Sequence, residues 1–124
     1  MPFLHDTALD LLLSDVINNG ESLHICSALP ANYTEASSTY SLGEKTSPTI
    51  NAASDRGGGG RESVVDAITD GAVDVTGTAD FWAIVKDSAT ARLLAAGDLS
   101  APQGVTNGNT FTLTQFAIGV PDAV

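Results

Sequence analysis

The chain has 124 residues, of which 43% are hydrophobic and 16% are charged. This composition is typical of one globular domain with a modest core and excludes a disordered chain. Fifteen acidic residues against five Lys and Arg give a formal net charge of −10, which disfavours binding to nucleic acid or to an anionic membrane surface. The single cysteine, Cys26, cannot form an internal disulfide, so stability must come from packing or from a partner.

Nothing near the N-terminus resembles a targeting segment. The apolar runs are far shorter than a membrane span, and the first residues lack the basic region of a signal peptide. We therefore expect this segment to belong to the folded product, made in the cytoplasm of its host, with no membrane partner.

The first predicted element is a helix over 6–19. Asp6 or Thr7 can cap it, and Asn18-Asn19-Gly20 supplies a stop that tolerates positive φ. Its apolar residues recur at helical spacing: Leu9, Leu12, Leu13, Val16 and Ile17.

A strand is predicted over 22–29, and Pro30 ends it. Residues 30–61 then form a polar tract that is long for a structureless loop in a compact domain. Two interpretations stay open. The tract is an excursion that wraps a neighbour, or it holds short ordered pieces around Tyr33, Tyr40, Leu42 and Ile50.

Residues 62–119 are expected to form a β-rich core. Asp70-Gly71 predicts a two-residue hairpin, and further turns are expected at 87–90 and 107–109. Both faces of 81–85 are apolar, which predicts a central strand covered on both sides. Phe111 and Leu113 face one way but Phe116 and Ile118 the other, so we expect a bulge or face switch near Gln115.

These elements predict a single domain over 1–124. The fold class is all-β, mainly an antiparallel β-sandwich or barrel, with one N-terminal α-helix and a long polar excursion.

The run Gly57–Gly60, between Arg56 and Arg61, is the most suggestive stretch for a binding loop. A phosphate loop needs a Lys after its glycines and a helix beyond them, and this run is followed by neither. We expect a flexible loop whose arginines stay solvated or pair with nearby carboxylates. The best functional alternative is a salt bridge to an acidic neighbouring subunit.

Other candidate sites are weaker. His24-x-Cys26 places two potential zinc ligands on one strand face, but the only further His or Cys is His5, so we expect no metal and no cofactor. The aspartates at 66, 70, 74 and 80 do not fit a calcium loop. No residue is assigned a catalytic role, and we expect no enzyme. Trp82 is expected in the core, with a carbohydrate platform as the sharper alternative.

The phrase SLHICSALPANYTEASSTYSLGEKTSPTI, followed by RESVVDAITDGAVDVTGTADFWAIVKDS and LLAAGDLSAPQGVTNGNTFTLTQFAIGVPD, resembles a family of small structural proteins of tailed bacteriophages. The resemblance spans nearly the whole chain and rests on phrase order, without a catalytic motif. The glycine run departs from the family pattern.

The resemblance implies a virion component, and the acidity favours a position that faces solvent. We expect a multi-copy capsid decoration or cement protein on the outer head surface, which binds the major capsid protein or other virion proteins and self-associates in the particle. A tail, neck or fibre-attachment protein is the alternative, and a host-surface carbohydrate-binding module is an alternative of another class. The candidate interface residues are Phe3, Leu4, Tyr33, Tyr40, Arg56 and Arg61.

Overall fold

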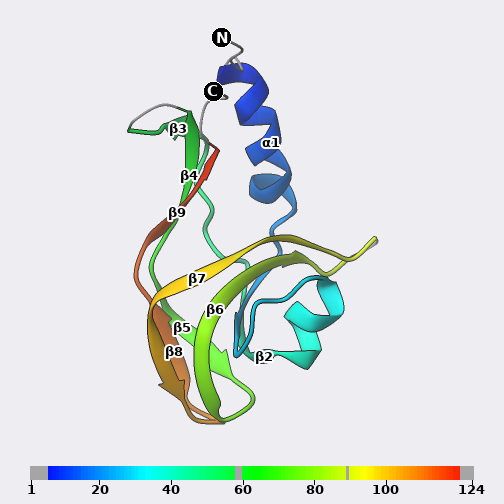
Figure 1. The fold of residues 1–124 in the computed structure, drawn as a ribbon, viewed down its shortest axis with the longest axis vertical. Helices are drawn as coiled ribbons and strands as arrows, with labels where there is room; N and C mark the ends of the chain where they lie inside the picture. The colour runs from blue at the N-terminus through cyan, green and yellow to red at the C-terminus, as the bar shows by residue number, and fades with distance from the viewer. Residues whose placement is uncertain (1–5, 58–59, 89, 121–124) are drawn as a thin grey trace.

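The computed structural model describes residues 6–57, 60–88 and 90–120 (Figure 1). The elements in chain order are α1 (Asp6–Asn19), β1 (Ser22–Cys26), the short π-helix η1 (Glu35–Thr39), β2 (Ser41–Thr46), β3 (Ser54–Asp55), β4 (Arg61–Val65), β5 (Ile68–Val73), β6 (Gly77–Lys86), β7 (Arg92–Val105), β8 (Thr110–Leu113) and β9 (Phe116–Val120). The fold is all-β with an N-terminal helix, as predicted. Among the described residues, no helix is both long enough and apolar enough to cross a membrane.

Six strands form one antiparallel sheet in the order β7-β6-β1-β2-β5-β8. The sheet curls into a half-barrel, so its two edge strands, β7 and β8, approach each other (Figure 1). The Gln103 side chain on β7 donates a hydrogen bond of 2.8 Å to the Thr112 carbonyl on β8. A side chain thus bridges the two edges where a further strand would close a barrel.

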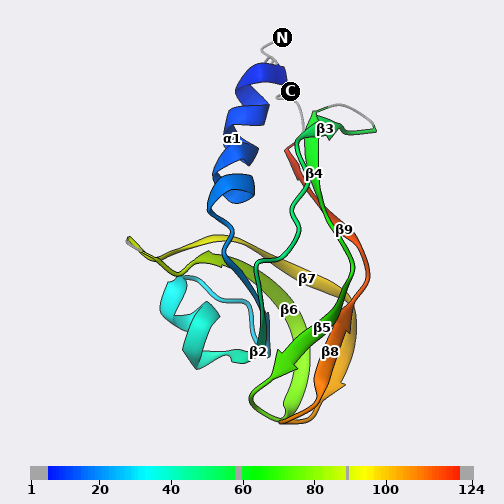
Figure 2. The ribbon, with the colours of Figure 1, turned by 180° about the vertical axis from the view of Figure 1, so that it is seen from behind.

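A second sheet has the order β3-β4-β9, and helix α1 lies beside it. Both views show α1 and this small sheet projecting together from one end of the half-barrel (Figure 1 and Figure 2). Two ion pairs attach the helix. Asp10 accepts from Arg61 Nε on β4 at 2.8 Å, and Asp15 accepts from Arg92 on β7 at 2.5 and 2.8 Å.

The core lies on both faces of the six-stranded sheet. The larger cluster fills the concave face and includes Leu23, Ile25, Ile84 and Phe111. A smaller cluster on the convex face joins Cys26, Ala36, Ala83 and Val85 under η1. Strand β6 therefore contributes buried side chains to both clusters, which confirms that 81–85 is a central strand covered on both sides.

The helix is found at the predicted bounds, but its stop has a different cause. The backbone N–H of Gly20 donates to the Val16 carbonyl at 2.9 Å, and Gly20 does not adopt positive φ. A Cβ at Gly20 would lie 2.6 Å from Ile50 Cδ1 and 2.7 Å from the Val16 carbonyl oxygen. Close approach of the chain therefore requires glycine here. The following strand is shorter than predicted, because β1 ends at Cys26 and not at residue 29.

The polar tract 30–61 is not one loop. It contains η1, strand β2 inside the large sheet, and strand β3, and Ile50 forms an isolated bridge with Val65. Ordered pieces around Tyr33, Tyr40, Leu42 and Ile50 are thus confirmed. Strand β2 was hidden in the sequence because SLGEKT has only one large apolar residue, Leu42.

The predicted hairpin at Asp70-Gly71 is wrong. Both residues lie inside β5, and the chain turns earlier, at Asp66-Ala67, where it leaves the small sheet for the large one. The Asp70 carboxylate forms a salt bridge with Lys45 on β2, with 3.0 Å between Oδ2 and Nζ. Gly71 lies opposite Phe111 of the neighbouring strand β8 and faces its ring.

The two later turns and the face switch are confirmed. Residues 87–91 separate β6 from β7, and Thr106–Asn109 separate β7 from β8. After Leu113 the chain passes through Thr114 and Gln115 and enters the other sheet at Phe116. The apolar side chains switch from one face of the chain to the other there because the two strands belong to different sheets.

Candidate functional site

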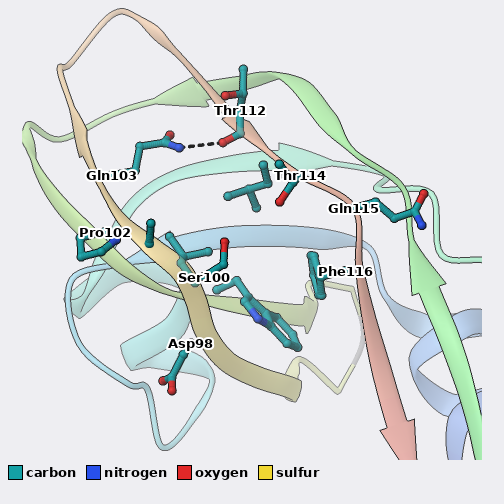
Figure 3. A pocket seen from close by; sticks show the side chains of 12 residues that line it. Asp98, Ser100, Pro102, Gln103, Thr112, Thr114, Gln115 and Phe116 are labelled. Carbon is teal, nitrogen blue, oxygen red and sulfur yellow. Dashed lines mark hydrogen bonds between the residues drawn. The ribbon is translucent and has the colours of Figure 1, made fainter. Parts of the chain in front are cut away.

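A groove opens between the two edge strands of the half-barrel, at the point where the chain leaves it for the small sheet (Figure 3). We call it the edge groove. Its volume is about 440 Å³, within the range of small-molecule sites. It is lined by Trp82, Asp98–Gln103 and Thr112–Phe116.

The sequence builds one wall through a large bulge in β7. Ala79 pairs with Gln103 and Phe81 with Asp98, so residues 99–102 stand opposite Asp80 alone. Such an insertion bends the strand away from its partner and releases its backbone from the ladder. Pro102 fits this position because it has no backbone N–H to contribute.

The other wall is the bend from β8 to β9. Ile68 pairs with Leu113 and Val65 with Phe116, so Thr114 and Gln115 lie outside the strand pairing of both sheets. Both side chains are exposed, and Leu113 is 92% buried beneath them. In Figure 3, Asp98 lies at one end of the groove, and the Gln103–Thr112 hydrogen bond lies at the other.

Trp82 forms part of the floor and belongs to the core, as predicted. It is 8% exposed, and its ring centroid lies 4.6 Å from that of Phe116. A Cβ at the cross-strand residue Gly97 would lie 2.9 Å from Trp82 Cζ2. The ring is therefore enclosed by its neighbours, and little of it faces the groove.

The lining of the edge groove combines apolar and polar side chains. Its floor is apolar, and its rim carries hydroxyls and amides from Ser100, Gln103, Thr112, Thr114 and Gln115. Asp98 is the single ionisable side chain among the twelve lining residues.

A second, more open hollow lies on the convex face beside η1. We call it the polar recess. Its volume is about 520 Å³, and it is lined by Ser22, His24, Tyr33, Ser37, Ser38, Glu44, Thr46 and Asp87. The Asp87 carboxylate accepts hydrogen bonds from the Ser22 hydroxyl and, at 3.0 Å, from the Tyr33 hydroxyl. This hydrogen bond from Tyr33 is the main reason why the pKa of the phenol is raised.

His24 lies at the base of the polar recess and is 5% exposed. Its Nδ1 is hydrogen-bonded to Ser41 Oγ at 2.9 Å, and its Nε2 lies 3.7 Å from Glu44 Oε2, too far for a hydrogen bond. Burial lowers the pKa of His24, while the nearby Glu44 charge acts in the opposite direction. The imidazole is therefore neutral at pH 7.

Cys26 shares this face but is buried further. Its Sγ donates to the Ala36 carbonyl at 3.7 Å, and burial raises the pKa of the thiol to about 11. A thiol with such a pKa is a poor nucleophile and a poor metal ligand at neutral pH. The described residues contain no cluster of three potential metal ligands, and His5 lies outside the described residues.

The candidate interface residues that the structure describes lie in two places, beside η1 and on or against the small sheet. Phe3 and Leu4 lie outside the described residues. Tyr33 and Tyr40 both pack against the convex cluster beneath η1. Arg61 pairs with Asp10 of the same chain, which agrees with the expectation that these arginines stay solvated or pair with nearby carboxylates. Arg56 lies against Gly119 of β9.

The sequence prediction missed the edge groove. The face switch near Gln115 marked one of its walls, but the bulge opposite Asp80 was not predicted, although Pro102 in LSAPQG was a local signal for it. Comparison of the chain with protein-family models, with curated proteins and with solved structures finds no match.

Proposed function

We propose that this protein is a structural component of a tailed bacteriophage particle, present in many copies as a decoration protein on the outer surface of the head. The resemblance of the sequence to small phage structural proteins, over nearly the whole chain, is the observation that carries the proposal.

The shape supports this role. Helix α1 and the small sheet project together from one end of the half-barrel (Figure 1). On β9, Phe116 and Ile118 are half-buried, and Ala117 and Gly119 are exposed. A projection of this kind is stabilised when a neighbouring subunit covers it, and many modest contacts repeated over a symmetric lattice hold a small protein firmly.

The charge supports an outward position. A net charge of −10 keeps free copies apart and disfavours contact with packaged DNA. In this role the protein bridges neighbouring shell subunits and resists the internal pressure of the genome.

Quantitative proteomics of purified particles tests the proposal. A decoration protein is expected in hundreds of copies per particle, in fixed ratio to the major capsid protein. Particles that lack the gene product should release their DNA at a lower temperature. A count of a few tens or fewer would instead favour the tail, the neck or a fibre attachment point.

A further inference from the structure

We infer that the edge groove binds an extended polypeptide segment of another virion protein, which inserts an apolar side chain onto the Trp82–Leu113 floor and places a basic residue beside Asp98. This inference rests on the proposed function and names the chemistry of the partner at one site.

Both walls of the groove offer backbone to a strand-like ligand. Residues 99–102 stand opposite Asp80 alone, and Thr114-Gln115 lies between the last pair of one sheet and the first pair of the other. Backbone outside a ladder can pair with an added extended segment, and the side chains of that segment then enter the neighbouring pocket.

The floor and rim match such a segment. Trp82 and Leu113 are each 8% exposed at the bottom of the groove, with half-buried Leu99 and Phe116 beside them. An apolar side chain placed there loses contact with water, while the hydroxyls and amides above it can bond to peptide groups.

Charge selects the partner. Asp98 is exposed and is the single ionisable group of the lining. Lys45, Arg61 and Arg92 are each paired with an aspartate of the same chain. A second copy would bring another net charge of −10 and few available cations, so a neutral or basic segment of a different protein fits better.

The enclosure of Trp82 argues against a saccharide. Sugar rings bind through stacking on an open aromatic face. Here Phe116 lies 4.6 Å from the indole ring, centroid to centroid, and Gly97 packs directly against it, so too little of the ring is open for a sugar to stack on it.

Photo-crosslinking on intact particles tests the inference. Benzoylphenylalanine is placed at exposed Thr114 in the groove or, as a control, at Leu29, which is 55% exposed and outside the groove lining. After irradiation, mass spectrometry maps the adducts. We expect the Thr114 probe to mark one segment of another virion protein that contains apolar and basic residues, and the Leu29 probe not to mark it.

Three results would overturn the inference. They are cross-links from Thr114 only to other copies of this chain, no adduct on particles that carry the protein, and loss of the adduct when a glycan panel is added as competitor. If purified particles lack the protein altogether, the proposed function is wrong as well. Failure of the groove inference and failure of the proposed function are therefore distinguishable.

Charge reversal gives an independent readout. Asp98→Lys should weaken binding to particles stripped of the protein by about tenfold, whereas Asp74→Lys, at another exposed aspartate, should bind like the wild type. Thermal melts establish that both variants fold. Equal weakening by both variants would show that overall charge, and not the groove, controls binding.

Discussion

Gly71 shows how a strong local pattern can mislead at the level of one residue. Asp-Gly between apolar runs is a common hairpin signal, but here Gly71 lies inside β5 opposite Phe111. A Cβ at Gly71 would lie 2.2 Å from two atoms of the Phe111 ring, and Phe111 is 1% exposed. Glycine is therefore needed to seat the largest fully buried side chain, not to turn the chain.

Gly71→Ala should lower the free energy of unfolding by about 1–3 kcal/mol, because the buried ring has no space into which to retreat. Chemical denaturation measures the change. Gly104→Ala is the matched control, because a Cβ there meets nothing within 4 Å. It should leave stability unchanged or raise it by up to about 1 kcal/mol. Equal effects of the two variants would contradict the account of Gly71.

Asp15 makes the ion pair with Arg92 sensitive to acid. The hydrogen bonds from Arg92, and then that from Asn19, lower the pKa of Asp15 from 3.8 to about 2. Because the pKa is depressed in the folded protein, the stabilisation is present above pH 4 and is lost as the pH falls toward 2.

The urea midpoint of Asp15→Asn should therefore lie below that of the wild type at pH 6, and the difference should shrink between pH 4 and pH 2. Asp98→Asn serves as a control without an intrachain ion pair in the described structure. A difference that stays constant across this range would contradict the proposed role of the Asp15 charge.

At the scale of elements, the sequence predicted what local periodicity encodes. The helix 6–19 and the doubly buried strand around Trp82 were predictable because their apolar patterns are unambiguous. Strand β2 was not predictable, since its position between β1 and β5 depends on partners distant in the sequence. The edge groove was missed for the same reason, because it forms only when the sheet curls and β7 bulges.

Helix α1 is the element whose attachment is most open to test. Two of its aspartates pair with different sheets, Asp10 with Arg61 on β4 and Asp15 with Arg92 on β7. Asp10→Asn should therefore raise amide exchange in α1 by up to about fivefold, since a partly exposed pair contributes at most about 1 kcal/mol.

Exchange in β1 and β6 should be unchanged in the same variant, because those strands lie in the centre of the large sheet. Asp74→Asn, at an exposed position away from the helix, is the control. Faster exchange throughout both sheets would show that the helix and the half-barrel unfold as one unit.

At the scale of the molecule, acidity should cost stability at low ionic strength. Fifteen acidic side chains share a small surface with five cations, and Lys45, Arg61 and Arg92 among these already pair with aspartates of the same chain. Added salt screens the remaining repulsion. The melting temperature should therefore rise as NaCl is raised from about 20 mM, where screening is weak, to about 500 mM, where it is strong. A fall would contradict net self-repulsion.

The whole molecule combines a half-barrel with a free groove at its edge and a thin projection of helix and sheet. These features suit a protein that is held by neighbours on more than one side, which is what a position on a shell lattice requires.

A symmetric electron-microscopy reconstruction of the intact particle tests this account most directly. We predict density that fits the half-barrel and its projection at many equivalent positions on the outer surface of the head, with a segment of a neighbouring protein in the edge groove. Density confined to a ring at the neck, to the tail or to a fibre base, with a bare head, would contradict the account.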